Sequence, residues 1–190
     1  MKNDLAALTC DLPIPSPDGE FIARYSSAGL CGLEFPSGTT RRKNDAGAAR
    51  PPAQIRQWHA AASKALRLAM AGRAPGQLPP LDLSRGTAFQ QRVWQTLRQI
   101  ACGRTWSYTE VARAIGKPNA VRAVGGACGA NPVPVFVPCH RVLAANRGLG
   151  GFSGGLDWKR ALLKREWIKL RVPEPKETPK PRQPNSPSLR

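Results

Sequence analysis

A cysteine and a histidine stand side by side at Cys139 and His140, directly after the apolar run 133–137 and Pro138. A thiol is a strong nucleophile as a thiolate, and a neighbouring imidazole can lower its pKa enough to supply thiolate at neutral pH. On an extended segment, however, adjacent side chains point to opposite faces, so the pair alone is a weak indication of catalysis. Its meaning depends on the elements that position it.

Metal chemistry is a weaker interpretation of the cysteines. The sequence has no Cys-x-x-Cys pair, and its two histidines are His59 and His140. A zinc site made of Cys10, Cys31 and His59 stays open as an alternative, but small core or surface residues are the favoured interpretation and we expect no metal. An odd number of cysteines at irregular spacing favours free thiols in a reducing compartment, so we expect a cytoplasmic protein.

The composition is strongly basic. The 190 residues include 29 Lys and Arg against 12 Asp and Glu, for a formal net charge of +17. Such an excess favours a polyanionic partner, most simply nucleic acid, although a basic protein without one stays an alternative. The N-terminus has no apolar run typical of a secretory signal, and no segment approaches the roughly 20 apolar residues that span a bilayer.

The first half, residues 1–84, predicts a small α/β domain. Residues 20–25 and 29–35 are typical of two strands of a hairpin, and residues 36–52 of a loop. Apolar residues at helical spacing predict a helix over 53–71, ended by Gly72. A short strand is expected at 81–83.

The second half, residues 85–170, predicts a mostly helical domain. Capping boxes at Thr87 with Gln90 and at Ser107 with Glu110 each predict the start of a helix. The first helix should bury an apolar face through Ile100 and end at Gly103. The second should end at Gly116, and a third over about 120–130 completes a helix-turn-helix. A last helix is expected from about 157 to 169, with Trp158, Leu162 and Trp167 at apolar positions. The proline-rich, basic residues 171–190 predict a disordered tail.

The third helix of this half is nearly free of bulky side chains. Glycine inside a helix costs up to about 1 kcal/mol relative to alanine, which indicates a need for close backbone approach. A neighbouring helix or a nucleic-acid backbone could be what approaches, and the sequence favours neither. Arg122 is the one long side chain on this helix.

Four segments together resemble the O6-alkylguanine-DNA alkyltransferase family. They are Arg122-Ala123-Val124-Gly125-Gly126-Ala127, Asn131-Pro132-Val133-Pro134, Pro138-Cys139-His140-Arg141-Val142 and Gly151-Phe152-Ser153-Gly154-Gly155. The similarity covers roughly residues 81–168. It implies an RNase H-like first domain, a helix-turn-helix second domain, and direct repair in which Cys139 irreversibly accepts the alkyl group from O6 of guanine without a cofactor. O4-alkylthymine stays open as a second substrate.

The resemblance also implies roles for the catalytic and DNA-binding residues. Glu166 would orient His140, which would act on Cys139 through a water. The nucleotide would be rotated out of the duplex from the minor groove. Arg122 would replace the extruded base, and Tyr108 would press on the phosphate of the target nucleotide. Tyr108 or a neighbouring residue would supply a proton to the leaving guanine. The small residues Ala123, Gly125 and Ala127 would let the helix lie close to DNA.

The resemblance also implies which residues form the substrate pocket. Asn131 would form a hinge, and Pro134, Val142 and Ser153 would line or read the guanine site. Phe152 departs from the tyrosine common at its place, so any role of that hydroxyl is in doubt. Arg141 should be structural, anchoring carbonyl or carboxylate groups.

The implied partner is double-stranded DNA containing O6-alkylguanine, with no membrane, no obligate protein partner and cooperative loading along DNA as an open question. The main alternative is a non-catalytic relative that binds alkylated DNA and signals to other repair, but such relatives lack the cysteine. A helix-turn-helix transcription factor would need polar base readers on the third helix. A cysteine hydrolase would need an oxyanion site, which nothing here marks.

Overall fold

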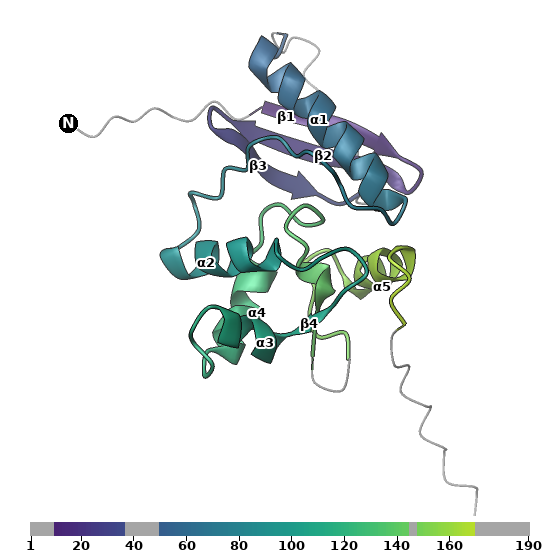
Figure 1. The fold of residues 1–190 in the computed structure, drawn as a ribbon. Helices are drawn as coiled ribbons and strands as arrows, with labels where there is room; N and C mark the ends of the chain where they lie inside the picture. The colour runs from purple at the N-terminus through teal and green to yellow at the C-terminus, as the bar shows by residue number, and fades with distance from the viewer. Residues whose placement is uncertain (1–9, 37–49, 145–147, 170–190) are drawn as a thin grey trace, which may run out of the picture.

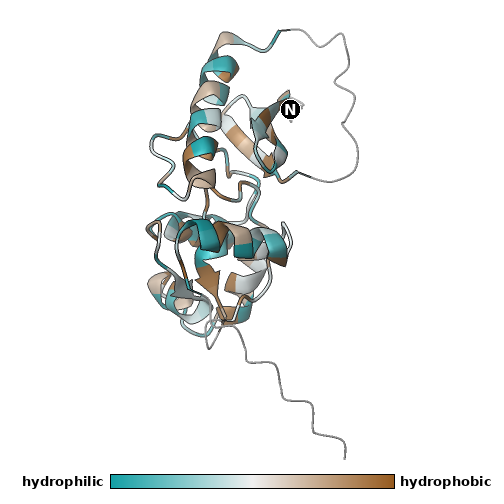
Figure 2. Ribbon diagram, turned by 90° about the vertical axis from the view of Figure 1, so that its right-hand side faces the viewer, coloured by the Kyte–Doolittle hydropathy of each residue, from teal (hydrophilic) through white to brown (hydrophobic). Residues whose placement is uncertain are grey.

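A three-stranded antiparallel sheet with one helix across it forms the upper half of the molecule in Figure 1. The computed structural model describes residues 10–36, 50–144 and 148–169. The strands are β1 (Cys10–Ser16), β2 (Gly19–Ser26) and β3 (Gly29–Glu34), in the order β1-β2-β3. Helix α1 (Ala53–Met70) lies on this sheet, and in Figure 2 it carries both hydrophilic and hydrophobic bands. Its buried residues face the strands because an amphipathic helix must cover its apolar side.

The predicted β2, β3 and α1 are confirmed, but the sequence interpretation missed β1. This strand contains Pro13 and Pro15, which argue against a central strand because proline cannot donate to the ladder. The sheet tolerates them because β1 lies at its edge and pairs only with β2. The strand expected at 81–83 is reduced to a single parallel bridge between Leu81 and Leu30.

The lower half is built from short helices around a two-stranded parallel ladder. Its elements are α2 (Ala88–Leu97), β4 (Trp106–Ser107), α3 (Tyr108–Ala114), α4 (Val121–Gly129), β5 (Val142–Leu143) and α5 (Leu156–Arg165). Both predicted capping boxes are present, at the starts of α2 and α3. The α3 and α4 helices follow one another through a short turn, as expected.

Two helix ends differ from the expectation. Helix α2 ends at Leu97, before Gly103, although Ile100 is still buried in the turn that follows. Helix α5 ends at Arg165, and the side chain of Trp167 is 90% exposed instead of buried on an apolar face. Trp167 has a positive φ of 59°, which stops the helix there.

The two halves pack through direct contacts. The backbone N–H of Leu33 donates to the carbonyl oxygen of Pro132 at 2.9 Å, and Arg165 donates to Asp18 at 2.6 Å. One cluster of buried side chains extends from the sheet to α5. The first half of the chain therefore contacts the second directly and can support the positions of its residues.

Some expectations lie outside the described residues: those for positions 1–9, for 37–49 of the loop, and for the tail from 170. Within the described ranges, no helix is both long and apolar enough to span a membrane.

Candidate active site

The nucleophile candidate lies on a single turn of 3₁₀ helix, Cys139–Arg141, and not on an extended strand. With three residues per turn, consecutive side chains point in three directions. Cys139 points to Asn131, whereas His140 and Arg141 both reach Glu166. All three residues of this turn are buried.

Glu166 fixes the imidazole. His140 Nε2 lies 2.9 Å from Glu166 Oε1, and Arg141 donates from Nε and Nη2 to the same carboxylate and from Nη1 to the carbonyl oxygen of Ile100. Since a carboxylate only accepts, Nε2 carries the proton and the Nδ1 of a neutral ring is left as a base. That Nδ1 atom is buried and has no hydrogen-bond partner among the described residues. Arg141 is structural, as the sequence predicts.

The charges of this cluster follow from its geometry. Burial alone would raise the pKa of Glu166, but the hydrogen bonds from His140 and Arg141 outweigh it and lower the pKa to about 2. Burial lowers the pKa of His140, against the opposing effect of Glu166. A neutral imidazole beside a carboxylate is therefore the resting state.

Asn131 connects the nucleophile to the preceding turn. Its Nδ2 donates to the carbonyl oxygen of Val137 at 2.8 Å and to Cys139 Sγ at 3.0 Å, while its Oδ1 accepts from the N–H of Val133 at 3.1 Å. The turn is strained at Val135, a β-branched residue with φ of 75°. Asn131 thus holds a strained segment and the sulfur together.

Burial raises the pKa of Cys139, although the Asn131 hydrogen bond and the charge of Lys159 oppose it. The expectation of a pKa lowered below its ordinary value was therefore wrong for the resting protein. With the side chain of Cys139 buried, the thiol stays protonated until a base removes its proton.

Sequence reasoning missed Lys159, a fully buried lysine on α5. Its Nζ donates to the carbonyl oxygens of Val142 at 2.7 Å, of Gly151 at 3.3 Å and of Leu149. Burial lowers its pKa to about 8, and the ammonium in turn favours a thiolate at Cys139. Lys159 thereby joins the segment after the nucleophile to the loop that carries Phe152 and Ser153.

A cavity of about 580 Å³ opens beside α4. Its lining includes Tyr108, Arg122, Gly125, Phe152 and Ser153, which the sequence interpretation assigned to DNA and guanine. Burial raises the pKa of Tyr108 to about 12, so the phenol keeps its proton at neutral pH. Of the residues predicted for the guanine pocket and its hinge, Phe152 and Ser153 line this cavity along α4, whereas Asn131, Pro134 and Val142 do not.

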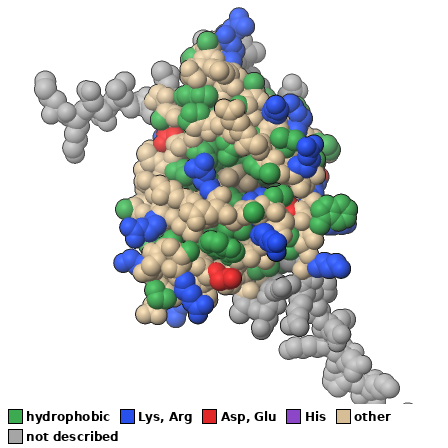
Figure 3. Space-filling view, viewed as in Figure 1, with side chains coloured by type: hydrophobic (Ala, Val, Ile, Leu, Met, Phe, Trp, Pro, Cys, Tyr) green, Lys and Arg blue, Asp and Glu red, His purple; other side chains and the backbone are tan. Residues whose placement is uncertain are grey.

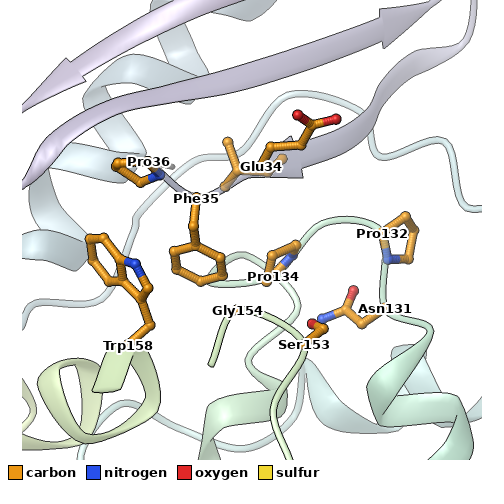
Figure 4. Close-up of a pocket in the computed structure, with 10 residues that line it drawn as sticks. Glu34, Phe35, Pro36, Asn131, Pro132, Pro134, Ser153, Gly154 and Trp158 are labelled. Atoms are coloured by element: carbon orange, nitrogen blue, oxygen red, sulfur yellow. The ribbon is translucent and has the colours of Figure 1, made fainter. Parts of the chain in front are cut away.

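A second cavity of about 450 Å³ lies between the end of β3 and the segment from Asn131 to Pro134, and Figure 4 shows its lining. Asn131, Pro134 and Ser153 come from the lower half, and Phe35 and Trp158 face them. The rings of Phe35 and Phe152 meet edge to face, with centroids 5.6 Å apart. The first half of the chain thus supports the wall of the candidate pocket.

The small residues of α4 divide into two groups. Ala127 is 2% exposed, and its carbonyl oxygen accepts from Trp94 Nε1 at 2.8 Å, so it packs against α2 and does not present its side chain for the expected DNA contact. Arg122 and Ala123 are exposed. At Gly126 and Gly129 an added Cβ would meet nothing within 4 Å. Packing within the protein therefore does not require these two glycines.

The alternative zinc ligands are not gathered into a site. His59 Nδ1 pairs with the Tyr25 hydroxyl at 3.2 Å, and Cys31 Sγ lies 3.4 Å from the carbonyl oxygen of Arg24. Among the described residues, no group of three or more His, Cys, Asp or Glu side chains is placed to hold a metal ion.

Comparison with known proteins agrees with this geometry. Residues 88–168 match the family described as 6-O-methylguanine DNA methyltransferase, DNA binding domain. A crystal structure of Mycobacterium tuberculosis OGT in complex with DNA superposes with a TM-score of 0.67 at 40% identity, covering 81% of this chain and 90% of that one. The chain belongs to the O6-methylguanine-DNA methyltransferase family.

Two curated relatives show how far the sequence match extends. The methylated-DNA–protein-cysteine methyltransferase of Haemophilus influenzae is 52% identical over 97 residues, which are 51% of this chain and 54% of that protein. The bifunctional transcriptional activator/DNA repair enzyme Ada of Escherichia coli is 56% identical over 87 residues, which are 46% of this chain and 24% of Ada. The chain thus matches about half of one methyltransferase and a quarter of Ada.

The segment matched to the methyltransferase family contains Cys139, His140, Glu166 and Lys159. Phe35, which supports the pocket from β3, lies outside it.

Proposed function

We propose that this protein repairs O6-alkylguanine in double-stranded DNA by moving the alkyl group onto Sγ of Cys139. The S–C bond forms as the C–O6 bond breaks; Tyr108 donates a proton to the restored guanine, and the thiol proton taken up by His140 returns through water to the Tyr108 oxygen, so the protons balance. The observation that carries this proposal is a pair of buried hydrogen bonds, Asn131–Cys139 and His140–Glu166, because they hold a thiol and an oriented base at adjacent positions of one turn. The sulfur becomes a thioether, so each molecule acts once and needs no cofactor.

The proton route uses the resting charges of the site. Cys139 is protonated at rest, and His140 has a free Nδ1 on a ring held by Glu166. We propose that one water connects this Nδ1 to the thiol, since a buried polar atom normally has a partner. Tyr108 retains its proton at neutral pH and is the proposed donor to the leaving guanine.

Recognition of DNA is assigned to α4. The exposed backbone at Gly126 and Gly129 allows a duplex to come close, and Ala123 and Gly125 add no bulk beside it. Arg122 lines the cavity and would fill the gap in the base stack when the nucleotide rotates out. Rotating the nucleotide out costs a few kcal/mol in lost stacking and pairing, and this cost is smallest for a damaged base. The OGT structure solved in complex with DNA supports DNA as the partner.

The proposed guanine site lies between Val142, Pro134, Phe152 and Ser153, with Asn131 as the hinge. The proposed layout keeps an RNase H-like domain at 1–84 and a helix-turn-helix domain at 85–170. Since Cys139 must stay a free thiol, a reducing compartment that holds DNA, the cytoplasm, is the proposed location. No obligate protein partner is required by this chemistry.

The deciding experiment uses a duplex with one O6-[³H-methyl]guanine. We expect label to move to protein up to one methyl per molecule, on the peptide that contains Cys139. Cys139→Ser should bind the duplex and transfer nothing, whereas Cys31→Ser should behave like the original protein. Label that stays on DNA with the unaltered protein would support a binding-only role, and repeated turnover would support a hydrolase.

A further inference from the structure

A basic groove lies where the end of α5 meets the end of α1, away from the α4 cavity. Its volume is about 920 Å³, and its lining includes Met70, Arg160, Lys164, Trp167, Ile168 and Lys169. In Figure 1, α5 lies at the far side of the lower half from α3 and α4. None of the residues assigned to alkyl transfer or duplex binding lines this groove.

The Trp167 side chain is 90% exposed and is held in an unfavourable backbone conformation. Its φ is 59°, a position at the end of a helix where glycine is usual and a bulky side chain is strained. The strain opposes folding, and the exposed indole contributes little burial to offset it. Since no packing contact among the described residues compensates for this strain, Trp167 is best explained by something that the indole binds.

The charge around Trp167 indicates the kind of ligand. Arg160 pairs with Asp157 at 3.0 Å and Arg165 with Asp18 at 2.6 Å. Lys164 and Lys169 are exposed, and neither has an ion-pair partner among the residues the structure describes. No carboxylate is among the described residues that line the groove. Figure 3 shows Lys and Arg side chains far outnumbering Asp and Glu on this view of the molecule.

The floor of the groove is rigid. Gly72, with φ of 71°, brings the turn after α1 so close to α5 that a Cβ there would collide with the carbonyl oxygen of Arg165. The Arg165–Asp18 pair ties the same end of α5 to the β1–β2 turn. The indole and the two unpaired ammonium groups are therefore presented from a fixed surface.

We propose that this groove is a second nucleic-acid contact, for a single-stranded segment of DNA. An exposed indole stacks on an unpaired base of any sequence, and cations on either side of it follow the phosphates. A duplex offers phosphates but no free base face, so the exposed Trp167 favours a single strand. The contact is separate from Arg122 and α4, and it does not depend on transfer to Cys139.

The test measures binding of a fluorescent, undamaged oligodeoxythymidylate to the full chain. Trp167→Gly should weaken this binding roughly five- to hundredfold, the range for one lost base stack. The same variant should melt at a higher temperature, because glycine relieves the strain, so a loss of binding is not a loss of fold. Lys164→Gln with Lys169→Gln should reduce the salt slope by about 1.4, whereas Lys64→Gln on α1 should leave binding nearly unchanged.

Mutations should affect the two proposed DNA contacts independently. Trp167→Gly should retain methyl transfer from damaged duplex, and Arg122→Ala should lose duplex repair while keeping the oligodeoxythymidylate. Unchanged oligonucleotide affinity in Trp167→Gly would overturn the proposal. A change in Trp167 emission on deletion of residues 171–190, without DNA, would also overturn it, because the tail would then occupy the groove. So would conversion of a dimer to a monomer by Trp167→Gly, because a second copy would then occupy it.

Discussion

The Nζ of Lys159 donates a hydrogen bond of 2.7 Å to the carbonyl oxygen of Val142, three residues after Cys139. Through its bonds to Leu149 and Gly151, the same ammonium holds the loop of the candidate pocket. A buried cation is expensive unless it is fully paired with hydrogen-bond acceptors. Here it serves two purposes, because it fixes the pocket loop and places a positive charge near the sulfur.

Replacing Lys159 by Met should slow methyl transfer and shift its pH profile. The lost charge no longer favours the Cys139 thiolate, so the pKa of the thiol rises and the rate reaches its plateau at a higher pH. Single-turnover transfer rates across a pH series measure this. Lys64→Met, an exposed change on α1, is the control. A lower rate with an unshifted profile would restrict Lys159 to holding the loop.

Glu166→Gln should destabilise the protein strongly. The change leaves Arg141 buried without its carboxylate, a loss of about 3–5 kcal/mol in the free energy of unfolding. It also removes the negative charge and turns one of the two acceptor oxygens into an NH2 donor, which weakens the hold on the His140 tautomer, so transfer should slow. Glu34→Gln breaks the surface pair with Arg24 and should change stability by about 1 kcal/mol or less. Urea unfolding compares the two variants, and equal effects would contradict a buried network.

Acid should remove part of the stability through Glu166. Its pKa is lowered from 4.5 to about 2 in the folded protein, so its contribution is complete above pH 4.5 and is lost as pH falls toward 2. Urea midpoints measured over this range should fall more steeply for the original protein than for Glu166→Gln. Glu110 and Asp82, whose pKa values are also lowered, titrate in both proteins and cancel in the difference. Parallel curves would contradict the assignment.

The sequence predicted correctly those structural features that depend on residues close together in the chain. The capping boxes at Thr87 and Ser107 are satisfied within one turn, so the helix starts could be identified from spacing alone. The placement of Glu166 beside His140 came from the family resemblance, since a glutamate after two basic residues is otherwise typical of a solvated helix face.

Contacts made by the backbone could not be predicted in this way. Lys159 stands among polar residues of α5, and its acceptors are carbonyl oxygens, which any residue carries. The raised pKa of Cys139 depends on burial, which only the assembled fold sets. The sequence also left the two interpretations of the small α4 residues equal. The structure shows that both apply to different residues, because Ala127 faces α2 whereas Gly126 faces open space.

Gly126→Ala should stabilise the protein and weaken its binding to DNA. A Cβ there meets no protein atom within 4 Å, so helix propensity should raise the free energy of unfolding by about 0.5–1 kcal/mol. The added methyl group would stand between α4 and an approaching duplex. Thermal unfolding and duplex titrations measure the two effects. Ala60→Gly, exposed on α1, should lower stability by a similar amount without altering DNA affinity; equal DNA affinity in Gly126→Ala would show that the duplex does not contact this face.

Phe35→Leu should reveal whether the first half shapes the pocket. The centroid of the Phe35 ring lies 5.6 Å from that of Phe152 and 4.9 Å from that of Trp158. Each ring pair contributes about 0.5–1.5 kcal/mol beyond its buried area. Leucine keeps apolar bulk but loses these two ring contacts and a third one to Phe21 at 5.5 Å, so unfolding should become easier by about 1.5–4.5 kcal/mol. The released Phe152 wall should slow methyl transfer while duplex affinity, set by α4, stays unchanged.

The matched control is Phe89→Leu, a half-buried ring on α2 outside the cavity linings. Both variants should unfold more easily, because each loses aromatic packing. Only Phe35→Leu should show a slower single-turnover rate at saturating duplex, since only its ring contacts the pocket wall. A normal rate in Phe35→Leu, despite lower stability, would mean that the loop from Gly151 to Ser153 is held by Lys159 alone and that β3 supports the fold without supporting the chemistry.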